Sequence, residues 1–193
     1  MAPSSLHKTM VAFAFVIVAI IFSLFSSESL AEDNAMRASA DSTINIVAIG
    51  ASNTAGWGVG TQNAYPTQLE VMLKAKGYNV QVANAGKSFD TTAGMLRRLD
   101  AALPQRTYMV IVQPGGNDLR FFGSKEQRAR NIAAIADRLR ARNIKVIMFE
   151  NTIVPSDLYQ WDGIHFTAKG HKWVASYLMR RVLALIDTYG LSD

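Results

Sequence analysis

The sequence predicts a three-layer α/β/α domain, in which helices cover both faces of a mostly parallel sheet of about four to five strands. Two observations support this prediction. First, short β-branched runs alternate with longer stretches that repeat apolar residues at helical spacing. Second, polar clusters that contain glycine follow the β-branched runs directly, as loops do at the carboxyl ends of parallel strands. Right-handed crossovers between such strands distribute the helices over both faces.

Four β-branched runs and four helical stretches make up the predicted domain. The first run ends at Gly50, and two of the helices end where Gly77 and Pro104 break the helical pattern. No internal repeat or low-complexity segment interrupts this order. The strands are predicted at residues 44–49, 78–83, 108–112 and 144–149, and the helices at residues 65–76, 92–103, 125–142 and 167–188.

The N-terminal segment has the pattern of an export signal. A single lysine precedes an uncharged apolar run over residues 10–25, and small residues lead up to Ala31. We therefore expect a signal peptide over residues 1–31, a flexible lead over residues 32–42 and one domain over residues 43–193. Export to the periplasm or the medium follows from this expectation. The alternative is an uncleaved anchor helix, because the run approaches the roughly 17–25 residues that cross a bilayer.

The composition limits the chemistry and the partners. The chain contains no cysteine, so an exported product folds without disulfides and uses neither a cysteine nucleophile nor a thiolate metal site. The formal net charge is +5, and it stays +5 after removal of one lysine and one glutamate with the signal. We interpret this positive charge as a contribution to solubility, and the alternative is attraction to an anionic surface. Contact with a membrane surface is compatible with it but not required, no nucleic-acid partner is indicated, and the oligomeric state is not specified.

Ser52 stands two residues beyond the first predicted strand, between Gly50 and Gly56. Glycines on both sides allow a tight turn that exposes the serine at the edge of the sheet. A serine hydroxyl is a weak nucleophile until a base removes its proton, so a catalytic role requires a histidine. The segment alone is equally typical of an ordinary turn, and both interpretations stay open at this point.

Two histidines remain after removal of the predicted signal, His165 and His171. Asp162 precedes His165 by three residues, a spacing at which a carboxylate can orient the imidazole and leave its other nitrogen facing the serine. His171 has no comparable acid ahead of it and is interpreted as a solvated or packed helix residue. A metal site of Asp162, His165 and His171 is the alternative, but it matches no metal-binding motif, so no metal or organic cofactor is expected.

Two further strand-end segments contain groups that could stabilise an oxyanion. Gly86 could present its backbone N–H where the missing side chain admits close approach of a substrate, and Asn117 could present its side-chain amide. The third donor would be the backbone N–H of Ser52. Each segment taken alone would be a turn.

Taken together and in order, these segments resemble the conserved blocks of the SGNH (GDSL-like) hydrolases, a superfamily of bacterial esterases, lysophospholipases and acyl-CoA thioesterases. The resemblance extends from the first strand to the last helix and implies a flavodoxin-like SGNH hydrolase fold. The matching segments are residues 50–56, 84–88, 115–118 and 162–165.

The resemblance implies a role for each matching residue. Ser52 would be the nucleophile, Asp162 and His165 would complete a catalytic triad, and Ser52, Gly86 and Asn117 would form the oxyanion hole. The implied reaction is hydrolysis of a carboxylic ester or thioester through an acyl-enzyme, and the implied substrate is a small-molecule or lipid-like ester.

The chain also departs from the pattern of this superfamily. Ala51 stands where aspartate is frequent, and Phe89 stands where a glycine often follows the second block. Only about a dozen residues separate the fourth predicted strand from Asp162, so we expect a minimal sheet and an open cleft that suits a small or surface-presented ester. Four side chains are candidates to line the site, although such residues more often serve packing or solvation: Trp57, Phe89, Arg120 and Phe121.

Other functions use the same scaffold. A carbohydrate deacetylase or an acyltransferase would need the same triad. A non-catalytic envelope module that binds glycans or lipids is supported only by Ala51 and the shortened chain, and it would not require all of the matching residues. A nucleotide-binding protein is disfavoured, because the glycines at residues 56–60 lack the spacing and the lysine of phosphate-binding loops.

Overall fold

The computed structural model describes residues 43–120 and 123–187 of the chain, and the predicted signal and lead lie outside these residues. Its four strands form one parallel sheet with the order β2-β1-β3-β4. The sheet is the minimal one expected from the short segment after the fourth strand. The strands are β1 (Ile44–Gly50), β2 (Val80–Gly86), β3 (Thr107–Gln113) and β4 (Lys145–Met148).

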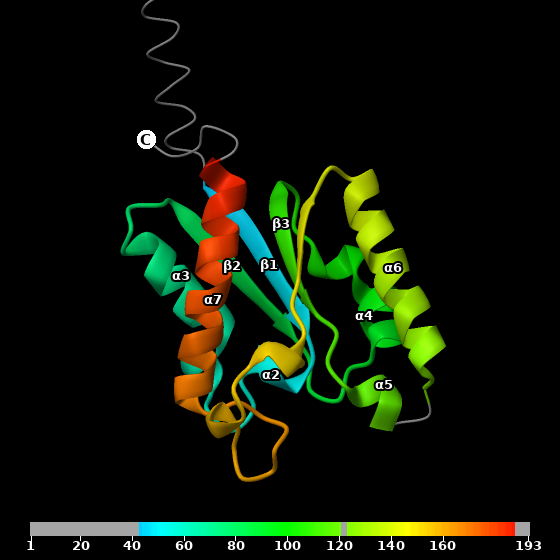
Figure 1. The fold of residues 1–193 in the computed structure, drawn as a ribbon. Coiled ribbons are helices and arrows are strands. Elements are labelled where there is room, and N and C mark those ends of the chain that lie inside the picture. The colour runs from blue at the N-terminus through cyan, green and yellow to red at the C-terminus, as the bar shows by residue number, and fades with distance from the viewer. Residues whose placement is uncertain (1–42, 121–122, 188–193) are drawn as a thin grey trace, which may run out of the picture. The chain divides into compact units, whose positions relative to one another are not determined.

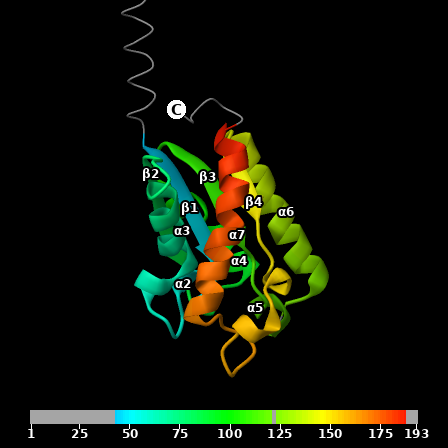
Figure 2. The same cartoon turned by 60° about the vertical axis from the view of Figure 1, so that its left-hand side comes forward.

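Helices cover both faces of the sheet (Figures 1 and 2). One face carries α3 and α7, and the other carries α4 and α6. Short helices occupy the connections at the carboxyl ends of the strands, except for η2, which lies between α4 and the start of β3. The long helices are α3 (Tyr65–Lys74), α4 (Thr92–Arg98), α6 (Lys125–Ala141) and α7 (Ala168–Asp187), and the short ones are α2 (Ser52–Ala55), η1 (Thr61–Asn63), η2 (Asp100–Ala102), α5 (Asn117–Arg120), η3 (Asn151–Ile153) and η4 (Ser156–Leu158).

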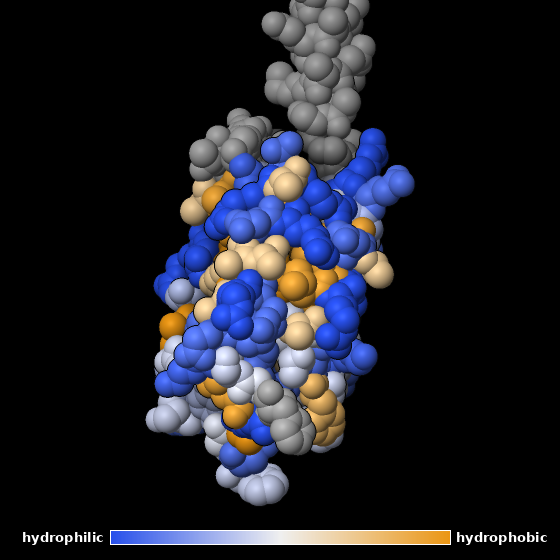
Figure 3. Space-filling view, turned by 90° about the vertical axis from the view of Figure 1, so that its right-hand side faces the viewer, coloured by the Kyte–Doolittle hydropathy of each residue, from blue (hydrophilic) through white to orange (hydrophobic). Residues whose placement is uncertain are grey.

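The two layers of helices bury two separate hydrophobic clusters. Because side chains alternate along a strand, Ile46 of β1 packs toward α3 and α7 while its neighbour Val47 packs toward α4 and α6. Nearly all of β1 is buried on both faces, as expected of a central strand in a parallel sheet. The outward side of α6, which faces the viewer in Figure 3, is mainly hydrophilic. Within the described residues, no helix has the length and apolarity to cross a membrane.

The second strand lies further along the chain than the sequence predicts. The sequence predicts it at residues 78–83, but β2 begins at Val80 and continues to Gly86. Pairing with β1 explains the difference, because Ile44 is in register with Val80 and Gly50 is in register with Gly86. Gly86 therefore ends a strand and does not belong to the loop that follows. The predicted helix at residues 92–103 is also shorter and passes into the 3-10 turn η2.

Candidate active site

Ser52 is the first residue of α2, immediately beyond the carboxyl end of β1. The turn that carries it depends on Gly50, because a Cβ at this position would overlap the hydroxyl of Thr54 and approach the carbonyl of Gln113 to 3.0 Å. Gly56 ends α2 with a φ of 87°, in the left-handed region that favours glycine. The two glycines thus hold Ser52 in a tight strand-to-helix turn with its side chain partly exposed.

Ser52, His165 and Asp162 form a continuous hydrogen-bonded chain. The Ser52 Oγ lies 3.0 Å from the His165 Nε2, and the His165 Nδ1 lies 2.6 Å from the Asp162 Oδ2. These distances lie within the range expected for a nucleophile, its base and the group that orients the base. The structure therefore brings together three residues that are separated by up to 113 positions in the sequence.

Asp162 is held in its ionised form by the loop that carries His165. Its Oδ1 accepts the backbone N–H of His165 at 3.0 Å and the backbone N–H of Ile164 at 2.9 Å. These bonds and the bond to the His165 ring lower the pKa of the Asp162 carboxyl to about 2. A carboxylate that stays charged favours the tautomer in which the imidazole carries its proton on Nδ1, so that Nε2 can accept the proton of Ser52.

Asn53 fixes the backbone on both sides of His165. Its Nδ2 donates to the carbonyl of Ile164 at 2.9 Å, and its Oδ1 accepts the N–H of Phe166 at 2.9 Å. The side chain is 3% exposed, so these hydrogen bonds are shielded from water. The residue that follows Ser52 therefore clamps the segment that carries His165. The sequence alone does not indicate this role, apart from the position of Asn53 next to Ser52.

His171 lies in the hydrophobic core and outside the site. Its Nδ1 accepts the backbone N–H of Tyr65 at 3.2 Å, and its ring lies among Tyr65 and Phe166. Its Nε2 is buried without a hydrogen-bond partner among the described residues. Burial, with a smaller contribution from the charge of His165, lowers its pKa to about 4. His171 is therefore a packed residue, and the expected alternative of a solvated one is excluded.

A small cavity opens beside the serine. Its volume is about 110 Å³, the size of a short acyl group or a single ring. Trp57 stacks on the His165 ring with centroids 5.6 Å apart, and it meets Phe89 edge-on at 6.0 Å. The lining residues are Ser52, Trp57, Ser88, Phe89, Asn117, Arg120, Ile164 and His165. Three of the four proposed lining residues are thus at the cavity, whereas Phe121 lies outside the described residues.

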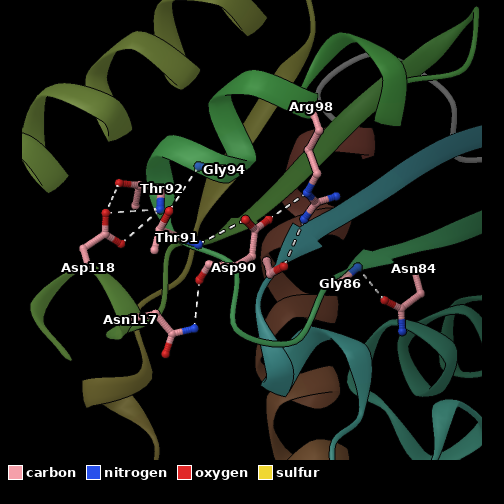
Figure 4. Close-up of polar contacts among 10 residues, drawn as sticks. Asn84, Gly86, Asp90, Thr91, Thr92, Gly94, Arg98, Asn117 and Asp118 are labelled. Atoms are coloured by element: carbon pink, nitrogen blue, oxygen red, sulfur yellow. Dashed lines mark hydrogen bonds and ion pairs between the residues drawn. The ribbon is translucent and has the colours of Figure 1, made fainter. Parts of the chain in front are cut away.

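Gly86, the predicted oxyanion donor, is not among the residues that line this cavity. Its N–H donates to the Asn84 Oδ1 at 2.9 Å (Figure 4). The missing side chain serves another purpose, because a Cβ here would overlap the backbone of Ala55 in α2. The loop after β2 reaches the cavity two residues later, at Ser88 and Phe89. The oxyanion-donor role predicted for Gly86 therefore has no support in this geometry.

Asn117 lies at the cavity and is held by the neighbouring loop. Its Nδ2 donates to the carbonyl of Asp90 at 2.8 Å, and Asp90 in turn forms an ion pair with Arg98 at 2.7 Å (Figure 4). The next residue, Asp118, accepts hydrogen bonds from Thr92. These contacts lock the loops after β2 and β3 together, so that the Asn117 amide is oriented before any substrate arrives.

Phe89 and Arg120 have unusual positions at the rim of the cavity. Phe89 has a φ of 63°, a conformation that costs a residue with a side chain about 1–2 kcal/mol, and the residue is 69% exposed. Arg120 lines the cavity and also a neighbouring one of about 320 Å³.

Among residues 43–120 and 123–187, no group of three or more metal-ligating side chains could hold a metal ion.

Comparisons with known proteins identify the family to which the chain belongs. The model of the GDSL-like lipase/acylhydrolase family matches residues 48–158. The esterase TesA of Pseudomonas aeruginosa is 32% identical over 112 residues, which cover 58% of this chain and 56% of the relative. An arylesterase of Vibrio mimicus is 28% identical over 123 residues, which cover 63% of this chain and 61% of the relative. The matched segment thus spans little more than half the length of these curated relatives.

The fold also matches solved structures. The psychrotrophic esterase EstA from Pseudoalteromonas sp., in a crystal structure inhibited by monoethylphosphonate, superposes with a TM-score of 0.65. The superposition covers 74% of this chain and 98% of that esterase, at 19% sequence identity. At this identity the match shows the fold alone. The parallel sheet with helices on both faces is shared with that esterase.

Proposed function

The chain belongs to the GDSL-like lipase/acylhydrolase family, and on that premise we propose that it is a serine esterase that hydrolyses carboxylic esters or thioesters through an acyl-enzyme on Ser52. One observation carries the proposal: the Ser52 Oγ lies 3.0 Å from the His165 Nε2, and the other ring nitrogen of His165 lies 2.6 Å from Asp162. An ordinary strand-end turn would not need this alignment.

In the proposed reaction, His165 accepts the proton of Ser52 as the Oγ attacks the carbonyl carbon of the ester. Asp162 holds the imidazole in its productive tautomer and stabilises its positive form. The Ser52 N–H and the Asn117 amide stabilise the negative oxygen of the tetrahedral intermediate. His165 then returns the proton to the leaving alcohol or thiol, and a water molecule activated by the same imidazole releases the acyl group.

The size of the cavity supports a short substrate group. A volume of about 110 Å³ accommodates a short acyl chain or one ring next to Ser52. Longer substrates would extend beyond this cavity over the surface. We therefore propose small or surface-presented esters as the substrate class.

Export is a further part of the proposal. The apolar run over residues 10–25 and the small residues before Ala31 support cleavage after Ala31 and release into the periplasm or the medium. N-terminal sequencing of the exported protein tests this. A membrane-bound product that still begins at Met1 would contradict it.

A fluorophosphonate probe tests the catalytic proposal. We expect the probe to form an adduct on Ser52, located by mass spectrometry, and Ser52→Ala to abolish both the adduct and the hydrolysis of p-nitrophenyl acetate. Circular dichroism of Ser52→Ala verifies its fold. Full esterase activity in a folded Ser52→Ala sample free of other hydrolases would refute the proposal.

A further inference from the structure

Exposed apolar side chains are concentrated at the end of the domain that carries the active site. Among the described residues, six large hydrophobic side chains are exposed, and Val71 on α3 is the single one outside the segments at the carboxyl ends of the strands. A concentration of exposed apolar side chains marks an interaction surface, whereas scattered ones need no explanation. The other five, which we call the apolar rim, are Trp57, Phe89, Leu119, Ile153 and Trp161.

Trp161 is the most exposed member of the apolar rim. Its side chain is 97% exposed, in the loop before α7 that projects beyond the rest of the domain in Figures 1 and 2. The loop is nevertheless ordered by hydrogen bonds, because the Gln160 N–H donates to the carbonyl of His165 and the Gly163 N–H donates to the carbonyl of Gln160. A defined backbone thus holds a large apolar ring in water, where the ring contributes nothing to folding.

The backbone at Trp57 and Phe89 differs in strain. Trp57 lies between Gly56 and Gly58, whose positive φ angles are unstrained in glycine. Phe89 adopts a positive φ without burying its ring. Backbone strain that burial does not offset is typical of functional positions. Both rings line the cavity beside Ser52, so whatever the apolar rim binds is presented to the nucleophile.

Charge on the same segments favours an anionic surface. Residues 51–64 contain no charged side chain, and Lys87 and Arg120 are exposed cations on the loops after β2 and β3. Glu150 is paired with Arg128, and Asp162 is partly buried and bonded to the His165 ring and to two backbone N–H groups. Among the described residues of these segments, the exposed acid is Asp157, so the exposed cations outnumber the exposed acids by two to one. Cations near a lipid surface bind anionic headgroups, and tryptophan prefers the interface between headgroups and acyl chains.

We propose that the apolar rim docks the active-site end of the domain on a lipid surface that contains anionic headgroups, and that the substrates are esters presented at that surface. The inference rests on the proposed function, because the docked surface must supply an ester to Ser52. A lipid surface fits better than a protein partner, since the rim consists of apolar side chains on separate loops around an open cavity, interspersed with cations.

A single fluorescent label tests the docking. The chain contains no cysteine, so Trp161→Cys and, as a matched control, Val71→Cys can each be labelled in the full chain with the environment-sensitive fluorophore NBD. On addition of vesicles of phosphatidylcholine and phosphatidylglycerol, we expect a blue shift and a rise in emission at position 161. The label at position 71 should remain as in buffer. No shift at position 161, or equal shifts at both positions, would overturn the proposal.

A soluble ester separates this proposal from the proposed function. We expect Trp161→Ser and Val71→Ser to hydrolyse p-nitrophenyl acetate like the unaltered chain, and Trp161→Ser alone to lose activity on an ester embedded in the vesicles. If the unaltered chain hydrolyses the soluble ester while the label at position 161 stays in water, the docking proposal fails and the esterase remains. If the label enters the lipid but no ester is hydrolysed, the proposed function fails.

Discussion

His165 and His171 are six residues apart, yet one lies at the cavity and the other is buried in the hydrophobic core. His165 lies in a loop at the end of the sheet, where its two ring nitrogens contact Ser52 and Asp162. His171 lies one turn into α7, where the hydrophobic core encloses it and lowers its pKa to about 4. The difference teaches that an imidazole becomes a useful base when a carboxylate orients it and solvent reaches it, and becomes a packing residue when burial disfavours its charged form.

The largest expected effect separates the two histidines directly. His165→Ala should lower kcat for p-nitrophenyl acetate by on the order of 10⁴–10⁶-fold, because the Ser52 hydroxyl then has no base. His171→Gln should retain the activity of the unaltered chain. The comparison fails if His171 proves essential and His165 dispensable, and the metal alternative at Asp162, His165 and His171 would then need to be reconsidered.

The carboxylate that distinguishes His165 is tested by Asp162→Asn. An amide can orient the ring in the wrong tautomer, and the equivalent change in serine proteases lowers kcat by about 10⁴-fold. We expect a loss of this order, measured by steady-state kinetics, in a protein that remains folded by circular dichroism. Because the pKa of Asp162 is about 2, its own ionisation should not limit activity at any pH above about 4. A kcat that falls by less than tenfold would mean that Asp162 does not orient the base.

The oxyanion donors are compared through two asparagines. Asn117→Ala should lower kcat by about 10²–10³-fold, the usual effect of losing one oxyanion donor. Asn84→Ala is the matched control, because Asn84 accepts the N–H of Gly86 and lies outside the cavity. We expect it to leave kcat unchanged. An unchanged kcat in folded Asn117→Ala would remove Asn117 from the site, and a changed kcat in Asn84→Ala would restore a role for Gly86.

A smaller effect is expected when the clamp on the His165 loop is removed. Asn53→Ala eliminates two hydrogen bonds to the segment that carries the base, and we expect kcat to fall by about ten- to hundredfold with little change in KM, since a misplaced base slows the chemical step. Asn63→Ala is the control, because Asn63 makes a similar side-chain bond, 2.9 Å to the carbonyl of Val59, on the exposed surface. Equal kinetics of the two variants would show that Asn53 does not position His165.

The smallest expected effect is on the free energy of unfolding, and it depends on the ionisation of His171. In the unfolded chain this imidazole takes up a proton below pH 6.5, whereas in the folded chain it does so only near pH 4. The unfolded state therefore binds more protons between these values, and the free energy of unfolding should fall by about 2 kcal/mol between pH 7 and pH 5 from this group. Urea unfolding at both pH values should show that His171→Gln removes this component. An identical pH dependence in both proteins would contradict the assignment.

Much of the fold and of the triad could be predicted from the sequence, for local reasons. The β-branched run before Gly50 predicts a buried strand, and the three-residue spacing of Asp162 and His165 predicts a carboxylate on the imidazole. The structure has the strand at Ile44–Gly50 and the expected contact at 2.6 Å. The second strand was predicted too early, because its limits are set by pairing with β1 and local propensity carries no information on register.

The sequence by itself determined the order of strands and helices and the positions of the candidate nucleophile, base and acid, because these depend on periodicity and short spacings. The tertiary structure decided which groups face the cavity. Gly86 turns toward Asn84 because β2 extends to it, and Asn53 reaches the flanks of His165 across more than a hundred residues of sequence. Such contacts arise when the carboxyl ends of parallel strands meet at one edge of the sheet, and no local pattern encodes which side chains meet there.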